Sequence, residues 1–191
     1  MYKAVFLDRD GTINEEMGYI NHINRFMMFS FVPDAIHLLN KAGYKTVLVT
    51  NQSGVARGYY DESLVRDVHE KLQKKLEEKS AHLDGIYYCP HHPTEGIGVY
   101  KKNCKCRKPK TGMIDSAVKE LNIDIKKSFM VGDRYKDIEF AKKAGLRAIF
   151  VKTGYGLGEF TYQKKKWTIQ PDYIAKDLLG AARYIQENPI Q

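Results

Sequence analysis

The stretch Val5-Phe6-Leu7-Asp8-Arg9-Asp10-Gly11-Thr12 decides the fold class, because an apolar run ends there in two carboxylates and a glycine. The run from Tyr2 to Leu7 is short, apolar and rich in strand-forming residues, which predicts a buried strand of a parallel sheet. Side chains alternate along a strand, so Asp8 and Asp10 should project to one side with Arg9 opposite. Open α/β sheets bind ligands at the carboxyl ends of their strands, so the stretch predicts a catalytic site.

Two neighbouring carboxylates repel each other unless a cation lies between them or one of them is protonated. A hard cation such as Mg²⁺ would leave Asp8 ionised and able to attack an electrophile. The alternative interpretation is an Asp-Gly turn that closes a strand and has no catalytic role. The stretch taken alone leaves both interpretations open.

Strands and helices are expected to alternate along the rest of the chain, which predicts an α/β fold with a doubly wound, mostly parallel sheet. The glycines at 154, 156 and 158 indicate a turn-rich stretch that does not match a dinucleotide-binding fingerprint. We expect a single domain over residues 1–191. The further predicted strands are Lys45–Val49, Gly85–Cys89, Ser128–Val131, Arg147–Val151 and Asp172–Ala175, and the predicted helices are Pro33–Gly43, a helix capped by Asp61, Gly112–Leu121, Lys136–Ala144 and Lys176–Gln186.

Composition limits the partners. The chain has 191 residues, 43% of them hydrophobic, which is enough for a sizeable core. A net charge of +8 favours anionic partners but does not distinguish nucleic acid from phosphorylated small molecules. The sequence shows no signal-peptide core and no apolar stretch long enough to span a membrane, so we expect a cytoplasmic protein without a membrane partner.

Three cysteines and one histidine lie at the two ends of a long segment without periodicity, from Pro90 to Pro109. Three sulfurs and one nitrogen are the ligand set of a closed tetrahedral Zn²⁺ site, and such a site would staple the segment. The predicted zinc-binding loop spans residues 89–106 and the zinc would be structural. The alternative is a set of free thiols with an incidental histidine. The predicted ligands are Cys89, His91, Cys104 and Cys106.

Four motifs follow one another in order: Asp8-Arg9-Asp10-Gly11-Thr12, Thr50-Asn51, Arg107-Lys108-Pro109, and Gly132-Asp133 with Asp137. This order resembles the haloacid dehalogenase (HAD) superfamily of phosphatases, and the match covers nearly the whole predicted core. The resemblance implies a HAD-like, Rossmannoid fold. The intervals after the first two motifs are too short for a separate cap domain, so loops would shape the pocket.

The resemblance also implies a mechanism. Asp8 would attack phosphorus and form an aspartyl phosphate, and Asp10 would act as general acid and then as general base. A catalytic Mg²⁺ would be bound by Asp8, Asp133 and the backbone carbonyl of Asp10, and would screen the repulsion between carboxylates and phosphate. The remaining implied roles are contacts of Thr50 and Lys108 with the phosphoryl oxygens, and support of the metal site or the lysine by Asp137.

A zinc-stapled loop on this core narrows the resemblance to the branch that acts on a sugar bisphosphate or on histidinol phosphate. A bisphosphate requires additional cations, which Arg107 and Arg134 would provide, whereas histidinol phosphate carries a cation and would require acids. The stretches Gly18-Tyr19, 51–58 and 104–109 resemble most the members that act on the bisphosphate. The resemblance therefore implies removal of the 7-phosphate of heptose 1,7-bisphosphate, with histidinol phosphate as the alternative. The substrate contacts implied by the resemblance are Glu16, Met17, Gly18, Tyr19, Asn51, Gln52, Ser53, Arg107 and Arg134.

An alternative from another class is a basic, zinc-stabilised module that binds nucleic acid. The spacing of the cysteines and histidine does not match a groove-reading finger, and no basic helix interleaves aromatic residues. We therefore expect a small phosphorylated sugar as the partner and no nucleic acid. We expect a monomer, with a weak homo-oligomer as the alternative.

Overall fold

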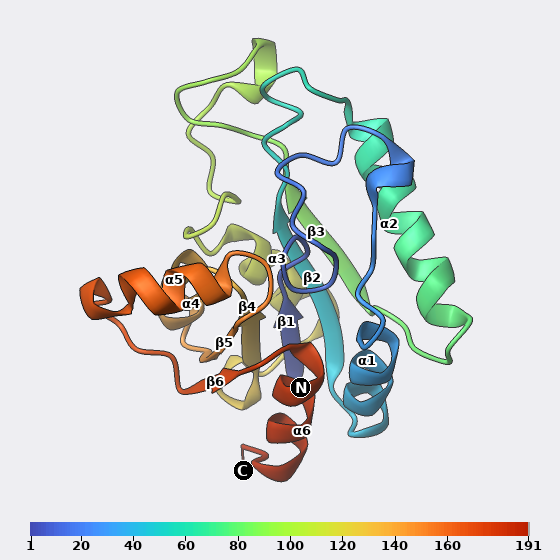
Figure 1. Ribbon diagram of the computed structural model, residues 1–191, viewed down its shortest axis with the longest axis vertical. Helices are drawn as coiled ribbons and strands as arrows, with labels where there is room; N and C mark the ends of the chain where they lie inside the picture. Colours follow the sequence, from blue (N-terminus) through green and yellow to red (C-terminus); the bar gives the residue numbers. More distant parts are fainter. Residues whose placement is uncertain (191) are drawn as a thin grey trace.

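The computed structural model describes residues 1–190, and its centre is a six-stranded sheet in the order β3-β2-β1-β4-β5-β6. All neighbouring strands run parallel, with β1 between β2 and β4 (Figure 1). This is the doubly wound parallel sheet that the sequence predicts. The strands are β1 (Ala4–Leu7), β2 (Lys45–Asn51), β3 (Gly85–Cys89), β4 (Phe129–Gly132), β5 (Arg147–Val151) and β6 (Tyr173–Ala175).

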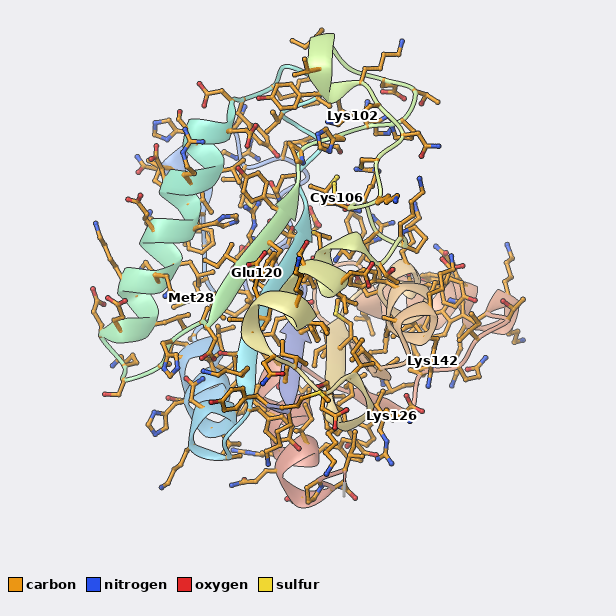
Figure 2. All side chains as sticks on the ribbon, turned by 180° about the vertical axis from the view of Figure 1, so that it is seen from behind. Met28, Lys102, Cys106, Glu120, Lys126 and Lys142 are labelled. Carbon is orange, nitrogen blue, oxygen red and sulfur yellow. The ribbon has the colours of Figure 1, made fainter. Side chains whose placement is uncertain are left out.

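Helices cover both faces of the sheet, so alternate side chains of β1 enter two different core layers. Val5 and Leu7 pack in the layer formed with α1, α2 and α6, whereas Ala4 and Phe6 pack in the layer formed with α3 and α4. Figure 2 shows the second layer, where α3 carries the labelled Glu120 and α4 the labelled Lys142. The helices are α1 (Val32–Lys41), α2 (Glu62–Glu77), α3 (Gly112–Leu121), α4 (Tyr135–Ala144), α5 (Gly156–Gln163) and α6 (Leu178–Glu187).

Local sequence signals explain where the helices begin and end. Pro33 lies in the first turn of α1, where its missing N–H costs no hydrogen bond. The Asp61 side chain accepts a hydrogen bond from the backbone N–H of Leu64 at 3.1 Å and so caps α2. Gly145 ends α4 in the left-handed conformation, with φ of 80°. The predicted helices therefore form close to where the sequence places them.

Helix α5 differs from the expectation, because the glycine-containing stretch that predicts turns is helical over Gly156–Gln163. Glycine disfavours helix, so the sequence signal is weak there. Tertiary contacts compensate: the buried Glu159 carboxylate accepts hydrogen bonds from Arg134 Nε at 3.1 Å and from the Tyr135 N–H at 2.7 Å. The helix is held against the start of α4 by these contacts.

The carboxyl ends of the strands and the segment from Pro90 to Pro109 lie at the same end of the molecule. In Figure 1 this segment arches above the sheet, and both chain termini lie at the opposite end. Its regular structure among the described residues is one short 3₁₀ turn, Gly98–Tyr100. No helix within residues 1–190 combines the length and apolar character needed to cross a bilayer.

Candidate active site

A cavity of about 290 Å³ lies at the carboxyl ends of β1, β2 and β4. Most of the predicted catalytic, magnesium-binding and substrate-binding residues line it. The exceptions are Met17, Gln52 and Asp133. The selected residues in the wall are Asp8, Asp10, Glu16, Gly18, Tyr19, Thr50, Asn51, Ser53, Arg107, Lys108 and Arg134, together with Asp137.

Asp8 follows the last residue of β1 and lies at the cavity floor. Its backbone N–H donates to the carbonyl of Val131 at 3.0 Å, which ties it to β4, and its Oδ1 lies 2.7 Å from Lys108 Nζ. The pKa of Asp8 is raised to about 7, mainly by burial; the charge of Asp137 adds to the rise and Lys108 opposes it. A divalent cation beside the carboxylate would favour its ionised, nucleophilic form.

Lys108 is buried between two carboxylates. Its Nζ lies 2.7 Å from Asp8 Oδ1 and 2.7 Å from Asp137 Oδ1. Burial alone would lower the pKa of Lys108, but the two carboxylates outweigh it and raise that pKa, so the ammonium stays charged. The Asn51 side chain holds the backbone of this residue, accepting from its N–H at 3.0 Å and donating to its carbonyl at 3.3 Å.

Asp10 has the opposite environment, although it lies only two residues from Asp8. Its carboxylate accepts hydrogen bonds from Arg9, from Asn14 at 3.0 Å and from Gln52 at 2.8 Å. Burial would raise the pKa of Asp10, but the Arg9 guanidinium and these hydrogen bonds outweigh burial and lower it. As expected, both aspartates line the cavity while Arg9 is buried, and Arg9 turns back to pair with Asp10 at 3.0 Å.

Asp133 is not part of the cavity wall, and one of its two carboxylate oxygens has no partner. The side chain is fully buried, Oδ2 accepts a hydrogen bond from the Tyr155 N–H at 2.8 Å, and Oδ1 has no hydrogen-bond partner. Burial and the charges of Asp8 and Asp137 raise the pKa of Asp133 well above its ordinary value. An unsatisfied buried oxygen among like charges is costly, so this set fits a divalent cation.

The group that the fold assembles for such a cation is Asp8, Asp133 and Asp137, each with one carboxylate oxygen within 4.8 Å of the others. The Asp10 carboxylate is not in this group. The atom of Asp10 that is predicted to bind the metal is its backbone carbonyl oxygen. Asp137 is also engaged elsewhere, because Oδ1 accepts from Lys108 and Oδ2 accepts from the Arg134 N–H at 3.1 Å. Asp137 was predicted to support either the metal site or the lysine. The structure shows a direct contact for the second role, between Asp137 and Lys108.

The polar residues after β2 divide between the cavity and its supports. Thr50 and Ser53 line the cavity. Gln52 is buried beneath it, where its Nε2 donates to Thr50 Oγ1 at 3.0 Å and its Oε1 accepts from Arg9 at 2.9 Å and from Tyr60 at 3.0 Å. The structure therefore places Gln52 between Asp10 and Thr50, away from the space that a substrate would fill.

The cavity mouth is formed by the loop after β1. Glu16 Oε1 accepts a hydrogen bond from the Gly18 N–H at 2.6 Å, which closes a tight turn. The ring of Tyr19 packs edge-on against Tyr59 with 4.8 Å between centroids. The Met17 side chain packs against the core instead of lining the cavity.

Part of the cavity wall is cationic. Arg107 donates to the His91 carbonyl at 3.0 Å, and Arg134 pairs with Glu159 at 3.1 Å. Three further wall residues were not predicted from the sequence, namely Arg57, Lys136 and Tyr155. Lys136 continues the polar run after β4, so extending that run would have found it. Val55 and Ala56 separate Arg57 from the polar run at the end of β2, and nothing in the sequence marks Tyr155.

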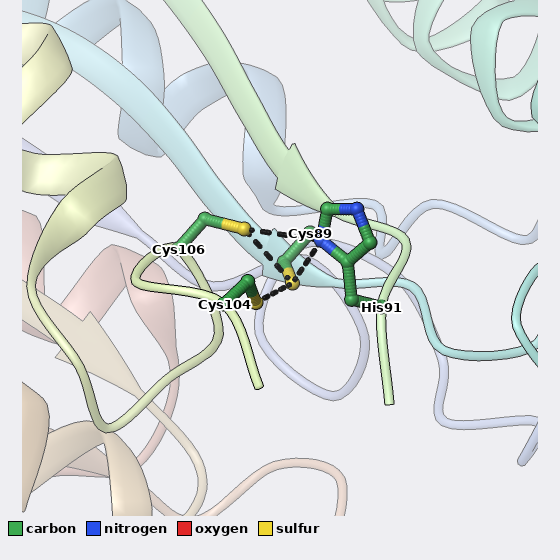
Figure 3. A group of neighbouring side chains, drawn as sticks. All are labelled: Cys89, His91, Cys104 and Cys106. Atoms are coloured by element: carbon green, nitrogen blue, oxygen red, sulfur yellow. Dashed lines mark hydrogen bonds between the residues drawn. The ribbon is translucent and has the colours of Figure 1, made fainter. Parts of the chain in front are cut away.

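The predicted zinc ligands converge on one point from the two ends of the loop (Figure 3). Cys89 Sγ lies 3.5 Å from Cys104 Sγ and 3.2 Å from Cys106 Sγ, and His91 Nδ1 lies 3.4 Å from Cys106 Sγ. Ligands at about 2.3 Å from a central zinc would be separated by about 3.8 Å, so a small expansion of this cluster accommodates the ion. Hydrogen bonding between the sulfurs raises the pKa of Cys89 and lowers that of Cys106 to about 5.

Comparisons with known proteins agree with this geometry. A family model described as HAD-hyrolase-like matches residues 105–181. D-glycero-beta-D-manno-heptose-1,7-bisphosphate 7-phosphatase of Pasteurella multocida (strain Pm70) is 49% identical over 97% of this chain and 98% of that protein. The enzyme of the same name from Haemophilus influenzae is 50% identical over 81% of this chain and 84% of that protein.

A solved structure gives the same result. The crystal structure of D,D-heptose 1,7-bisphosphate phosphatase from B. bronchiseptica, complexed with magnesium and phosphate, superposes with a TM-score of 0.85. It is 29% identical to this chain and covers 97% of this chain and 99% of that one. The chain belongs to the HAD-like hydrolase family. Within that family it is a phosphatase.

Proposed function

We propose that the enzyme removes the 7-phosphate of D-glycero-β-D-manno-heptose 1,7-bisphosphate through an aspartyl phosphate on Asp8. The observation that carries this proposal is the placement of Asp8, bonded to Lys108 at 2.7 Å, on the floor of a cavity with a cationic wall. The names of the relatives and of the solved structure support the substrate.

In the first step Asp8 Oδ attacks phosphorus while the bond from phosphorus to the sugar oxygen breaks, and Asp10 gives a proton to the departing alcohol. This requires the protonated form of Asp10, which the negative charge of a bound phosphate favours against the effect of Arg9. In the second step a water attacks phosphorus and its proton passes to Asp10, which releases phosphate and restores the Asp8 carboxylate. Lys108 and Thr50, which line the cavity, would contact phosphoryl oxygens as their charge redistributes.

Mg²⁺, held by Asp8, Asp133 and the Asp10 carbonyl, would supply charge neutralisation between the carboxylates and the phosphate. Magnesium is present in the solved relative from B. bronchiseptica, and the unpartnered Asp133 Oδ1 gives it a ligand here. Zn²⁺ bound by the three cysteines and His91 would have no open position and would stabilise the loop. Arg107 and Lys108 directly follow the last predicted zinc ligand, Cys106.

The second phosphate of the substrate requires positively charged side chains in addition to those that contact the reacting phosphate. Arg57, Arg107, Arg134 and Lys136 all line the cavity, whereas Glu16 is the acid of the mouth loop in its wall. Guanidinium groups bind phosphate with paired hydrogen bonds, so this wall suits a bisphosphate better than a substrate with a cationic amine. The expected role of the remaining mouth residues is to contact the sugar.

The test is phosphate release from heptose 1,7-bisphosphate, histidinol phosphate and a panel of sugar monophosphates, each with Mg²⁺ and with EDTA. The proposal expects metal-dependent release with the highest kcat/KM for the bisphosphate. If phosphate is released equally well or better from histidinol phosphate, the proposed substrate is wrong and the proposed mechanism stands. No metal-dependent release from any of them would overturn both.

A second experiment tests the cationic wall. Arg107→Ala should raise KM for the bisphosphate about tenfold or more, because removal of a charge-assisted contact costs about 1.5–3 kcal/mol. Hydrolysis of p-nitrophenyl phosphate, which has no second phosphate, should change much less. An equal loss with both substrates would show that Arg107 serves the reacting phosphate or the loop instead.

A further inference from the structure

Residues Gly154–Glu159, here called the β5–α5 segment, contact the Asp133–Tyr135 stretch at three points. The Tyr155 N–H donates to Asp133 Oδ2 at 2.8 Å. The Tyr155 ring faces the Arg134 guanidinium, with 4.5 Å between the guanidinium carbon and the ring centroid. Glu159 accepts from Arg134 Nε and from the Tyr135 N–H. None of the four sequence motifs includes this segment.

Gly154 makes the first contact possible. Its φ is +53°, and a Cβ at this position would lie 2.4 Å from Asp133 Oδ2 and 2.4 Å from the Gly11 Cα. Both distances are far below van der Waals contact, so any larger residue would push the segment away from Asp133. The backbone therefore approaches the carboxylate closely because residue 154 has no side chain.

The two oxygens of the Asp133 carboxylate have different surroundings. Oδ2 is occupied by the N–H of Tyr155, whereas Oδ1 is buried without a partner. Asp133 belongs, through one carboxylate oxygen, to the group that fits a divalent cation. A carboxylate fixed through one oxygen presents the other in a defined direction. Groups that hold a ligand in this way strongly affect metal affinity in other proteins.

We propose that the β5–α5 segment is a fifth functional element of the active site, in which Tyr155 is a positioning residue that orients Asp133 for the metal through its backbone N–H. The proposal rests on the magnesium site of the proposed function and adds the element that sets its ligand geometry. Glu159 and the Tyr155 ring hold the neighbouring Arg134, so one segment would adjust both the metal site and the cationic wall.

The first experiment compares Gly154→Ala with Gly158→Ala. A Cβ at Gly158 meets no atom within 4 Å, so this change is the matched control in the same segment. Mg²⁺ affinity is measured without substrate, by calorimetric titration, and thermal unfolding is followed in parallel. Gly154→Ala should weaken Mg²⁺ binding by about ten- to a hundredfold, and Gly158→Ala should bind as the wild type does.

The second experiment separates the effect of the Tyr155 backbone N–H from that of its side chain. It tests the proposal even if Gly154→Ala does not fold. Tyr155 has φ of −74°, which proline adopts readily, so Tyr155→Pro removes the N–H donor at nearly the native backbone angle. Tyr155→Ala removes the ring and keeps the N–H. Tyr155→Pro should weaken Mg²⁺ binding by about tenfold or more relative to Tyr155→Ala.

Equal Mg²⁺ affinity of Tyr155→Pro and Tyr155→Ala would overturn the proposal, as would wild-type affinity of a folded Gly154→Ala. A wild type that binds no Mg²⁺ would overturn it together with the metal site of the proposed function. If the wild type binds Mg²⁺ but does not hydrolyse the heptose bisphosphate, only the proposed substrate fails, because the titrations contain no substrate.

Discussion

The catalytic edge and the cysteine loop lie at the same end of the molecule but are ordered in different ways. At the catalytic edge, Asp8 and Asp133 come directly after β1 and β4, whose pairing of Leu7 with Val131 sets their relative height. The loop from Pro90 to Pro109 has little such pairing; its one isolated bridge joins His92 and Lys101. Its two ends meet through the side chains of the predicted zinc ligands, Cys89 and His91 at one end and Cys104 and Cys106 at the other.

The difference shows that backbone pairing places the two aspartates, whereas a bound ion is expected to place the loop. Lys108 belongs to both regions, because it comes from the end of the loop and its ammonium lies between Asp8 and Asp137. Damage to the loop should therefore reach the catalytic edge through one residue. Four changes test this comparison, from the largest expected effect to the smallest.

Asp8→Asn should affect the catalytic edge alone. The substitution removes the attacking charge at nearly constant volume, so turnover should fall by about 10⁴-fold or more, as for removal of other nucleophiles. Thermal unfolding and zinc content should match the wild type. The control Asp34→Asn, at an exposed position in α1, should keep full turnover. Substantial activity of Asp8→Asn would refute the nucleophile.

Cys104→Ser should affect the loop first and the catalytic edge second. Loss of a zinc ligand should release the ion and lower the free energy of unfolding by several kcal/mol, since structural zinc binding contributes directly to folding. Turnover should also fall because Lys108 loses its placement. The measurements are zinc content, thermal unfolding and kcat at saturating Mg²⁺. A zinc-selective chelator on the wild type should reproduce the result; unchanged stability after zinc loss would contradict it.

Asn51→Ala tests the connection between the two regions. Its amide bonds both backbone groups of Lys108, so its removal should lower kcat by about ten- to a hundredfold and cost about 1–3 kcal/mol of stability. Asn40 in α1 provides the control, because it bridges Thr46 of β2 and His82 away from the cavity: Asn40→Ala should lose stability and keep kcat. If Asn51→Ala raises KM with kcat unchanged, Asn51 acts as the substrate contact predicted from the resemblance.

His69→Gln tests the buried support behind Asp10. Burial, together with the charge of Arg9, lowers the pKa of His69 to about 3, so the folded state keeps this histidine neutral. Its contribution to stability is complete above about pH 6.5 and is lost as the pH falls towards 3, because only the unfolded chain takes up the proton.

Between pH 6.5 and pH 5 the wild type should lose about 2 kcal/mol more stability than His69→Gln. Urea unfolding at both pH values measures this difference. His37→Gln, at an exposed position, should retain the pH dependence of the wild type. An identical pH dependence of His69→Gln and the wild type would show that His69 does not titrate in this way.

Much of the fold and many of the site residues could be predicted because their signals are local. The apolar run before Asp8, the caps and the alternation of strands with helices depend on neighbours in sequence. The carboxyl ends of parallel strands share an edge, so residues that follow different strands gather there without further information. For that reason Asp8 and Thr50 were expected at one site, whereas Lys108, at the end of a long loop, was assigned to it by the family resemblance; all three line one cavity.

Other features were missed or assigned differently because they depend on contacts between distant segments. Helix α5 has a glycine-rich start that predicts turns, and its contacts with Arg134 and Tyr135 stabilise it as a helix. Gln52 was expected to contact the substrate, but its amide is used by Asp10 and Thr50. The direction of a side chain on a loop is set by its partners, which the sequence does not list.

By itself, the sequence determined the order of strands and helices except α5, the HAD-like motifs and the residue types for two metal sites, since each depends on local pattern or on family likeness. Only the tertiary structure decided the different environments of the two aspartates, Asp8 and Asp10. Asp8 contacts the buried Lys108. The Asp10 carboxylate accepts hydrogen bonds from Arg9, Asn14 and Gln52. The tertiary structure also brought Tyr155 against Asp133 across 22 residues of chain. Such contacts arise from packing between elements, and no local pattern encodes them.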